Sequence, residues 1–195
     1  MLNPESREFY NRWRCKADAY EGDDVRDLFD RFVTQFVIYN RLYADATFSL
    51  ASENRIRLDP DGSFPDGKAA KSYVAQYLGA TSLIEALEAD PGCAEAIRAV
   101  IRLLSARVSE RQFFIILDKI TGAHQPEEDK RLLNSLRSTS RAARAEGILE
   151  FLYAVRVNLI HGHKSFEPIQ KEVVQPANVL LSRIIDILFE RLNRD

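Results

Sequence analysis

The stretch RVNLIHGHK, residues 156–164, brings one arginine, one asparagine and two histidines together where an apolar helical pattern gives way to a glycine. Histidine transfers protons near neutral pH, and arginine binds and neutralises phosphate oxygens. Both side chains therefore suit the cleavage of a phosphodiester without a metal. Asn158 could hold either group or the substrate. Arg156, Asn158, His161 and His163 are therefore the candidate site residues, and the residue types alone do not choose between the two histidines.

The spacing of an arginine and a histidine is weak evidence by itself, because a chain with three histidines and many arginines contains such a pair about once by chance. On one continuous helix, Arg156 and His161 would lie about 140° apart around the axis and about 7.5 Å apart along it. They would not lie side by side, whereas Asn158 and His161 share a face. A phosphate bound by both Arg156 and His161 is easier to place at a two-fold interface, or if the helix ends before His161.

The wider sequence around the motif is more specific. The residues YAVRVNLIHGHKSFE, with a long predicted helix on either side, resemble the HEPN family, whose signature is an arginine separated from a histidine by four to six residues, often followed by Gly and Lys. An early apolar run that ends in Asn, Leu and Tyr, here FVIYNRLY at 36–43, is similar to this family as well. So are the FFIILD segment and the polar loop after it. The resemblance covers most of residues 24–193.

The resemblance implies an all-α, HEPN-like helical bundle that dimerises, so that two Arg–His motifs face each other across a cleft. Many members are metal-independent endoribonucleases, often toxins or anti-phage effectors, and others bind nucleotide, RNA or protein without catalysis. Arg156 then matches the family arginine, Asn158 the polar residue two positions on, and His161 the histidine. We accordingly expect RNA as a partner, a homodimer, and neither a cofactor nor a metal.

Further residues are expected to have supporting roles. A toxin subgroup carries Tyr two residues after the histidine, where a partner nucleotidyltransferase modifies it, but this chain has His163 there, which speaks against control by that route. An antitoxin or a nucleotidyltransferase remains a candidate partner. We expect His163, Lys164 and Arg144 to help bind the substrate. Asn40, on the apolar face of the helix at 24–46, is expected to be a buried, hydrogen-bonded amide, and the resemblance also allows it to support the motif helix from within the bundle.

Basic side chains gather around the motif, although the net charge of the chain is -2. Residues 130–164 hold seven basic side chains against two acidic ones, Glu146 and Glu150. This segment could carry an RNA backbone, or it could consist of two solvated basic helix faces. The acidic total argues against a general affinity for nucleic acid. It favours a non-catalytic binding module as the rival to a nuclease.

Other chemical readings are open or disfavoured. Arg156 could simply interact with helix carbonyls near a C-terminus, as cations do, and a purely structural helical protein would use none of these side chains in catalysis. His161 and His163 form an HxH pair, but no cysteine or acidic cluster lies close enough in sequence to complete a metal site. No Gly-rich phosphate loop, GxSxG or CxxC sequence is present, which disfavours P-loop nucleotide hydrolases and serine hydrolases.

The composition predicts a single domain over residues 1–195, with its core at about 24–193. A chain of 195 residues with 46% hydrophobic content can bury a substantial core, and its eight Gly and seven Pro are few, which favours helix. Cys15 and Cys93 lie far apart, and the first residues lack the apolar core of a signal peptide. No apolar run approaches the length of a membrane span. We therefore expect a soluble, cytoplasmic protein.

Apolar side chains recur every three or four residues in several segments, which predicts amphipathic helices. These helices are expected at 24–43, 68–77, 81–89, 93–105, 128–138, 140–160 and 170–193. The principal members of the bundle would be those at 24–46, 140–160 and 169–193.

Polar residues and glycines predict where the helices begin and end. Asp23 or Asp24 is expected to cap the first long helix, and Gly162 to end the motif helix. Two segments rich in polar residues, Pro and Gly, 52–67 and 121–129, are predicted to be loops. The short apolar segment 112–117 is compatible with a buried helix end or with a short strand.

Overall fold

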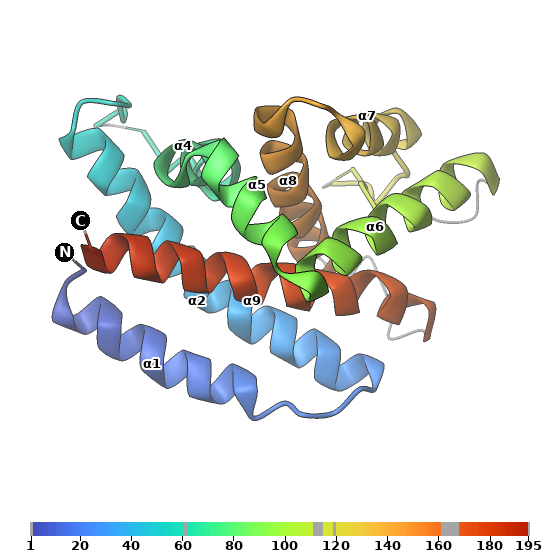
Figure 1. Cartoon of the computed structure of the whole chain (residues 1–195), viewed down its shortest axis with the longest axis horizontal. Helices are drawn as coiled ribbons and strands as arrows, with labels where there is room; N and C mark the ends of the chain where they lie inside the picture. The colour runs from blue at the N-terminus through green and yellow to red at the C-terminus, as the bar shows by residue number, and fades with distance from the viewer. Residues whose placement is uncertain (1, 61, 111–114, 119, 161–167, 195) are drawn as a thin grey trace.

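The computed structural model describes residues 2–60, 62–110, 115–118, 120–160 and 168–194, which form an all-α helical bundle (Figure 1). Within these ranges no β-strand is formed, and Leu117 and His124 make one isolated antiparallel bridge. The predicted all-α helical bundle is therefore confirmed. The helical elements are α1 (Pro4–Asp18), α2 (Val25–Ser52), α3 (Asp66–Lys68), a π-helical turn (Ala69–Tyr73), α4 (Val74–Leu78), α5 (Ala80–Ala89), α6 (Pro91–Glu110), α7 (Pro126–Arg137), α8 (Arg141–Ile160), a 3-10 turn (Pro168–Gln170) and α9 (Lys171–Arg194).

Helix α9 crosses the whole molecule and contacts helices on both sides (Figure 1). It packs against α2 on one side and against α6 on the other, while α1 lies along α2. Helix α8 packs against α5 and α7 and is buried on most of its surface. Apolar side chains from all these helices meet in one continuous core, in which burial of large side chains supplies the main stabilisation. The end of α8, which carries the motif arginine, is thus held by the core.

The three principal helices were predicted close to their observed bounds. Asp24 caps α2, because its carboxylate accepts hydrogen bonds from the backbone N–H groups of Arg26 (2.8 Å) and Asp27 (3.1 Å). Asp23, the other candidate, instead forms an ion pair with Lys171 at the start of α9. Helix α2 runs on beyond 46 to Ser52, since buried residues continue to follow the helical repeat.

Helix α1 was not among the predicted helices. Asn3 caps it by accepting a hydrogen bond from the N–H of Ser6 (2.7 Å), and Pro4 occupies the first turn, where a missing N–H costs nothing. Tyr10 stacks on Phe189 of α9 with ring centroids 3.6 Å apart. Asn3 and Pro4 are a recognisable capping signal, but the polar segment that follows them shows no clear apolar repeat.

The loop predicted at 121–129 is wrong for its last four residues, because α7 begins at Pro126. Proline is favoured in a first helical turn, and the acidic residues that follow it interact well with the helix dipole. Asp129 is buried, and its carboxylate accepts hydrogen bonds from the backbone N–H groups of Ile115 (3.1 Å) and Ile116 (2.9 Å). The start of α7 therefore anchors the segment 115–118.

Smaller differences concern the ends of elements. The helix predicted at 68–77 begins two residues earlier, inside the predicted loop 52–67, and includes the π-helical turn. Residues 115–118 form neither a helix nor a strand, and 112–114 lie outside the described residues. Helix α8 ends at Ile160, and the predicted stop at Gly162 also lies outside them. No helix in the part of the chain that the structure describes is long and apolar enough to cross a membrane.

Candidate functional site

The motif arginine lies on the next-to-last turn of α8, on the side that faces α2. The carbon of its guanidinium group lies 5.9 Å from the ring centroid of Phe36 and 5.6 Å from that of Tyr153. Aromatic faces attract cations, although more weakly than a carboxylate does. Arg156 forms no ion pair or hydrogen bond with any residue in the described ranges, and its Nε is buried without an acceptor. A partly buried cation of this kind favours an anionic ligand.

Asn40 of α2 lies next to Arg156 of α8. Both residues line a small cavity of about 40 Å³, together with Phe36, Leu159 and Ile160. The side-chain oxygen of Asn40 is buried and has no hydrogen-bond donor. The cavity is too small for a nucleotide. It marks a place where the guanidinium of Arg156 and the amide of Asn40 could both bond to one group at the surface.

Two tyrosines and an aspartate fix the ring that faces Arg156. The hydroxyls of Tyr43 and Tyr153 both donate to the carboxylate of Asp66 at the start of α3, and the bond from Tyr153 is 3.0 Å long. Burial, and then the hydrogen bond and charge of Asp66, raise the pKa of Tyr43, while burial and Asp66 also raise the pKa of Tyr153. The positive charge of Arg156 opposes both shifts. Asp66 was missed in the sequence, where it is one of several polar residues in a predicted loop.

An exposed apolar face of α2 lies next to the arginine. Val33 and Ile160 both line the cavity of Arg156 and are exposed, Ile160 to 55%. Phe48 is 57% exposed further along α2 and packs against Phe64, with ring centroids 5.9 Å apart. On α2, positions 33, 37, 40, 44 and 48 follow the three-and-four spacing of one helix face. Exposed apolar groups gathered beside an unpaired cation are typical of an interaction surface.

Asn158 lies on a different side of α8 from Arg156. It is 6% exposed, and its amide nitrogen donates to the backbone carbonyl of Ile115 at 2.6 Å. With Ile115, Leu159 and Gln170 it lines another small cavity. Asn158 and Asp129 thus hold the segment 115–118 by its carbonyl and N–H groups. The structure does not bring Asn158 together with Arg156 in one cavity.

The remaining predicted site residues are not joined to Arg156. His161, His163 and Lys164 lie outside the described residues. Arg144 is on α8 but is twelve residues, or about 18 Å, before Arg156 along the helix. It forms an ion pair with Glu88 of α5, at 2.5 Å. The structure therefore places Arg144 in an interhelical contact away from the motif.

The basic segment around the motif is largely paired with acids from the fold. The pairs are Lys130 with Glu127 (2.7 Å), Arg131 with Glu128 (2.8 Å), Arg141 with Glu85, and Arg144 with Glu88. Arg137 donates to the hydroxyl of Ser105 at 2.6 Å. The local positive charge that the sequence indicates is therefore mostly compensated. The ion pairs therefore argue against the expectation that these residues bind an RNA backbone.

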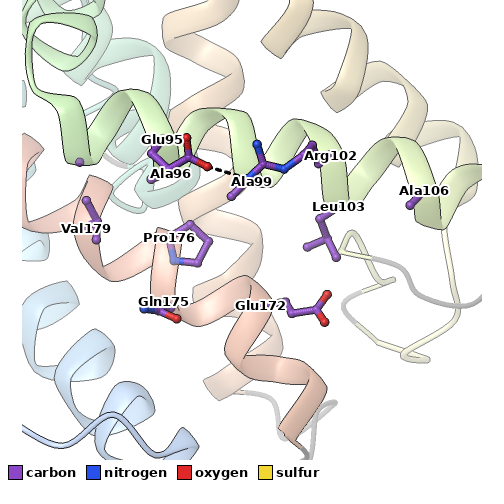
Figure 2. Close-up of a pocket in the computed structure, with 11 residues that line it drawn as sticks. Glu95, Ala96, Ala99, Arg102, Leu103, Ala106, Glu172, Gln175, Pro176 and Val179 are labelled. Carbon is purple, nitrogen blue, oxygen red and sulfur yellow. Dashed lines mark hydrogen bonds and ion pairs between the residues drawn. The ribbon is translucent and has the colours of Figure 1, made fainter.

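A larger groove, which Arg156 and Asn158 do not line, lies between α6 and α9 and has a volume of about 640 Å³ (Figure 2). Small side chains of α6, among them Ala96 and Ala99, face Pro176 of α9 across it. Glu95 and Arg102 form an ion pair at 2.6 Å along one edge. The groove has no unpaired charged group at its floor, and it offers no evident catalytic chemistry.

No group of three or more His, Cys, Asp or Glu side chains suited to a metal ion occurs in the described part of the chain. Comparison of the sequence with protein-family models and with curated proteins, and of the structure with solved structures, gave no match. The candidate site is therefore defined by its residues alone. They are Arg156 with its aromatic neighbours, Asn40, and the exposed apolar face of α2.

Proposed function

We propose that the protein is a metal-independent endoribonuclease of HEPN type that acts as a homodimer. The observation that carries this proposal is the guanidinium of Arg156, which is partly buried between aromatic rings without a carboxylate partner in the described residues. A phosphate would supply the missing negative charge and could accept two parallel N–H bonds from the guanidinium. In the sequence, His161 follows Arg156 by five positions, within the motif RVNLIH.

A second copy of the chain would cover the exposed face of α2. Val33 and Ile160 at the rim of the Arg156 cavity are exposed apolar side chains, and burying them against the same residues of a partner is favourable. In a two-fold dimer built on this face, the two arginines would lie close to the symmetry axis. Arg156 of one copy could then act together with His161 of the other copy in one composite site. The two residues would not need to lie on the same face of a single helix.

The proposed chemistry needs one general acid–base group and one positive charge. A His161 imidazole takes the proton of the ribose 2′-hydroxyl as the 2′-oxygen attacks the phosphorus. Arg156 stabilises the negative charge that builds on the phosphoryl oxygens. The bond from phosphorus to the 5′-oxygen then breaks, and that oxygen receives a proton from an imidazolium, His161 or His163. The products are a 2′,3′-cyclic phosphate end and a 5′-hydroxyl end.

The experiment that tests this function is cleavage of a mixed-sequence RNA by the purified chain in EDTA. Wild type should cleave, and His161→Ala should lose activity by about a thousandfold, as expected when a general acid–base group is removed. His163→Ala tests the alternative histidine. His124→Ala is the matched control, because that histidine lies in the loop before α7, outside the motif. Absence of cleavage by wild type, or equal cleavage by His161→Ala, would refute the proposal.

The rival function is a non-catalytic HEPN-like module that binds nucleotide, RNA or a protein. It is favoured by the ion-paired state of the basic segment, which leaves little free positive charge to hold a long RNA. Binding of a labelled RNA that depends on Arg156, without turnover, would support this function instead.

A role as a toxin or phage-defence effector, with an antitoxin or nucleotidyltransferase partner, is tested separately by growth arrest on expression of wild type beside His161→Ala.

A further inference from the structure

A second polar cavity, of about 570 Å³, lies where the connection between α1 and α2 passes the start of α9. Figure 1 shows this connection joining the two blue helices. The ion pair between Asp23 and Lys171 ties it to α9. Gln175 and Val179 line both this cavity and the groove of Figure 2.

Two buried side-chain amides line this cavity without a full set of partners. Asn178 is 4% exposed, and its nitrogen donates to the carbonyl of Leu28 at 2.8 Å. This bond fixes which end of the amide is the oxygen, and that oxygen has no donor. Gln35 is 3% exposed, and its oxygen also lacks a donor. Buried polar atoms are nearly always hydrogen-bonded, so two such acceptors in one cavity point to a ligand with N–H groups.

The same cavity contains an arginine without a counter-ion. Arg31 donates weakly to the carbonyl of Gly22 (3.4 Å), and its Nε is buried without an acceptor. It makes no ion pair with any carboxylate in the described ranges, although three acidic residues line the cavity. Asp18 pairs with Arg14 (3.4 Å), and Asp23 pairs with Lys171. An anionic group on a ligand would supply the partner that Arg31 lacks.

Glu21 is a further charged residue of this cavity. It lines the cavity, is exposed, and forms no ion pair within the described part of the chain. The cavity therefore offers one unpaired cation, one unpaired anion and two buried carbonyl-type acceptors. A metal ion would not use Arg31, and a simple diamine would leave it unpaired. A molecule with a carboxylate and an ammonium group matches all four.

We propose that this cavity binds a free α-amino acid. The carboxylate of the ligand pairs with Arg31, and its ammonium group donates to the side-chain oxygens of Asn178 and Gln35, with Glu21 adding negative charge nearby. The volume leaves room for the side chain of the amino acid beside Leu28 and Val179. This site is separate from Arg156 and does not depend on the proposed nuclease function.

The first test uses the full chain and the common amino acids, each added at about 10 mM, with thermal unfolding as the readout. At least one amino acid should raise the unfolding midpoint, and calorimetry then gives its Kd. The N-acetyl derivative and the methyl ester of that amino acid each lack one charge, and each should bind about tenfold more weakly or worse. No shift with any amino acid, or equal binding of both derivatives, would overturn the proposal.

Variants test the named residues. Arg31→Met and Gln35→Met keep the size of the side chain and remove the guanidinium and the amide oxygen, and each should weaken binding by about tenfold or more. Arg26→Met, an exposed arginine on α2, is the matched control and should bind as wild type does. Asn178 is left intact because it also holds Leu28. If putrescine binds as tightly as the amino acid, or if Arg31→Met and Gln35→Met bind it normally, the assignment is wrong.

Discussion

The two sides of the last turns of α8 differ in how their polar groups are satisfied. Arg156 faces α2 with a charged group that has no carboxylate or carbonyl partner in the described residues, next to exposed Val33 and Ile160. Asn158 is buried on another side and donates to the carbonyl of Ile115. Two residues that stand two apart in one motif therefore have different structural roles. The Asn158 side holds the fold together, and the Arg156 side carries a group that the fold itself does not use.

The largest expected effect on stability comes from a substitution at Asn158. Asn158→Leu keeps the approximate size but leaves the buried carbonyl of Ile115 without its donor, which should lower the free energy of unfolding by about 2–3 kcal/mol. Urea unfolding followed by circular dichroism measures it. Asn134→Leu, at an exposed position of α7, should change stability by less than about 0.5 kcal/mol. A loss as small in Asn158→Leu as in this control would show that the bond to Ile115 contributes little.

The next effect concerns the apolar surface on the Arg156 side. Val33→Asp puts a charge into the proposed dimer face and should weaken dimerisation by about 2 kcal/mol, or roughly thirtyfold in Kd. Sedimentation equilibrium measures the change. Val179→Asp is a matched control, since Val179 is a similarly exposed valine on α9 that does not line the cavity of Arg156. A chain that is monomeric at every concentration, or a dimer disrupted equally by both variants, would remove this surface from the proposal.

The helices were largely predictable because their signals are local. Asp24 follows a glycine and precedes a long apolar repeat, and it caps α2 as local capping chemistry requires. Asn3 and Pro4 carry a similar signal for α1, but the three large apolar groups of this helix, Phe9, Tyr10 and Trp13, are too few to form a long apolar repeat like that of α2. Local chemistry of this kind is contained in a few neighbouring residues.

The partners of the site residues could not be predicted, because they come from distant parts of the chain. The sequence shows no acidic partner for Arg144, whereas the fold brings Glu88 of α5 next to it. Nothing in the sequence distinguishes Asp66 from other loop residues before the fold brings Tyr43 and Tyr153 to it. The unpaired state of Arg156 is likewise a property of packing. A sum of charges over 130–164 therefore overstated the positive surface.

The stability of the fold should depend on pH through Tyr153, whose ring faces Arg156. The folded pKa of Tyr153 is raised above its usual value near 10, mainly by burial and by Asp66. The folded state therefore keeps this proton at a pH where the unfolded chain loses it. The contribution to stability is complete below about pH 10 and declines as the pH rises beyond it.

Tyr153→Phe removes the titrating hydroxyl and should flatten this decline. Urea unfolding of wild type and variant between about pH 9 and pH 11 measures the slope, and each protein serves as its own reference at about pH 7. Because the hydroxyl also donates to Asp66, the variant should be somewhat less stable at neutral pH. Identical slopes in both proteins would mean that Tyr153 ionises as easily when folded as when unfolded.

The smallest expected effect on stability belongs to Arg156 itself. Its guanidinium bonds to nothing in the described part of the fold, and its removal leaves no buried partner unpaired, so Arg156→Met should change the free energy of unfolding by less than about 0.5 kcal/mol. RNA cleavage in EDTA, or RNA binding if there is no cleavage, should nevertheless be lost, because the phosphate charge would have no partner. Arg144→Met should do the reverse: it breaks the ion pair with Glu88, at a cost of up to about 1 kcal/mol, and leaves RNA cleavage intact. If Arg156→Met instead destabilises the chain and leaves activity toward RNA unchanged, Arg156 is part of the structural core, and the contrast between the two sides of α8 disappears.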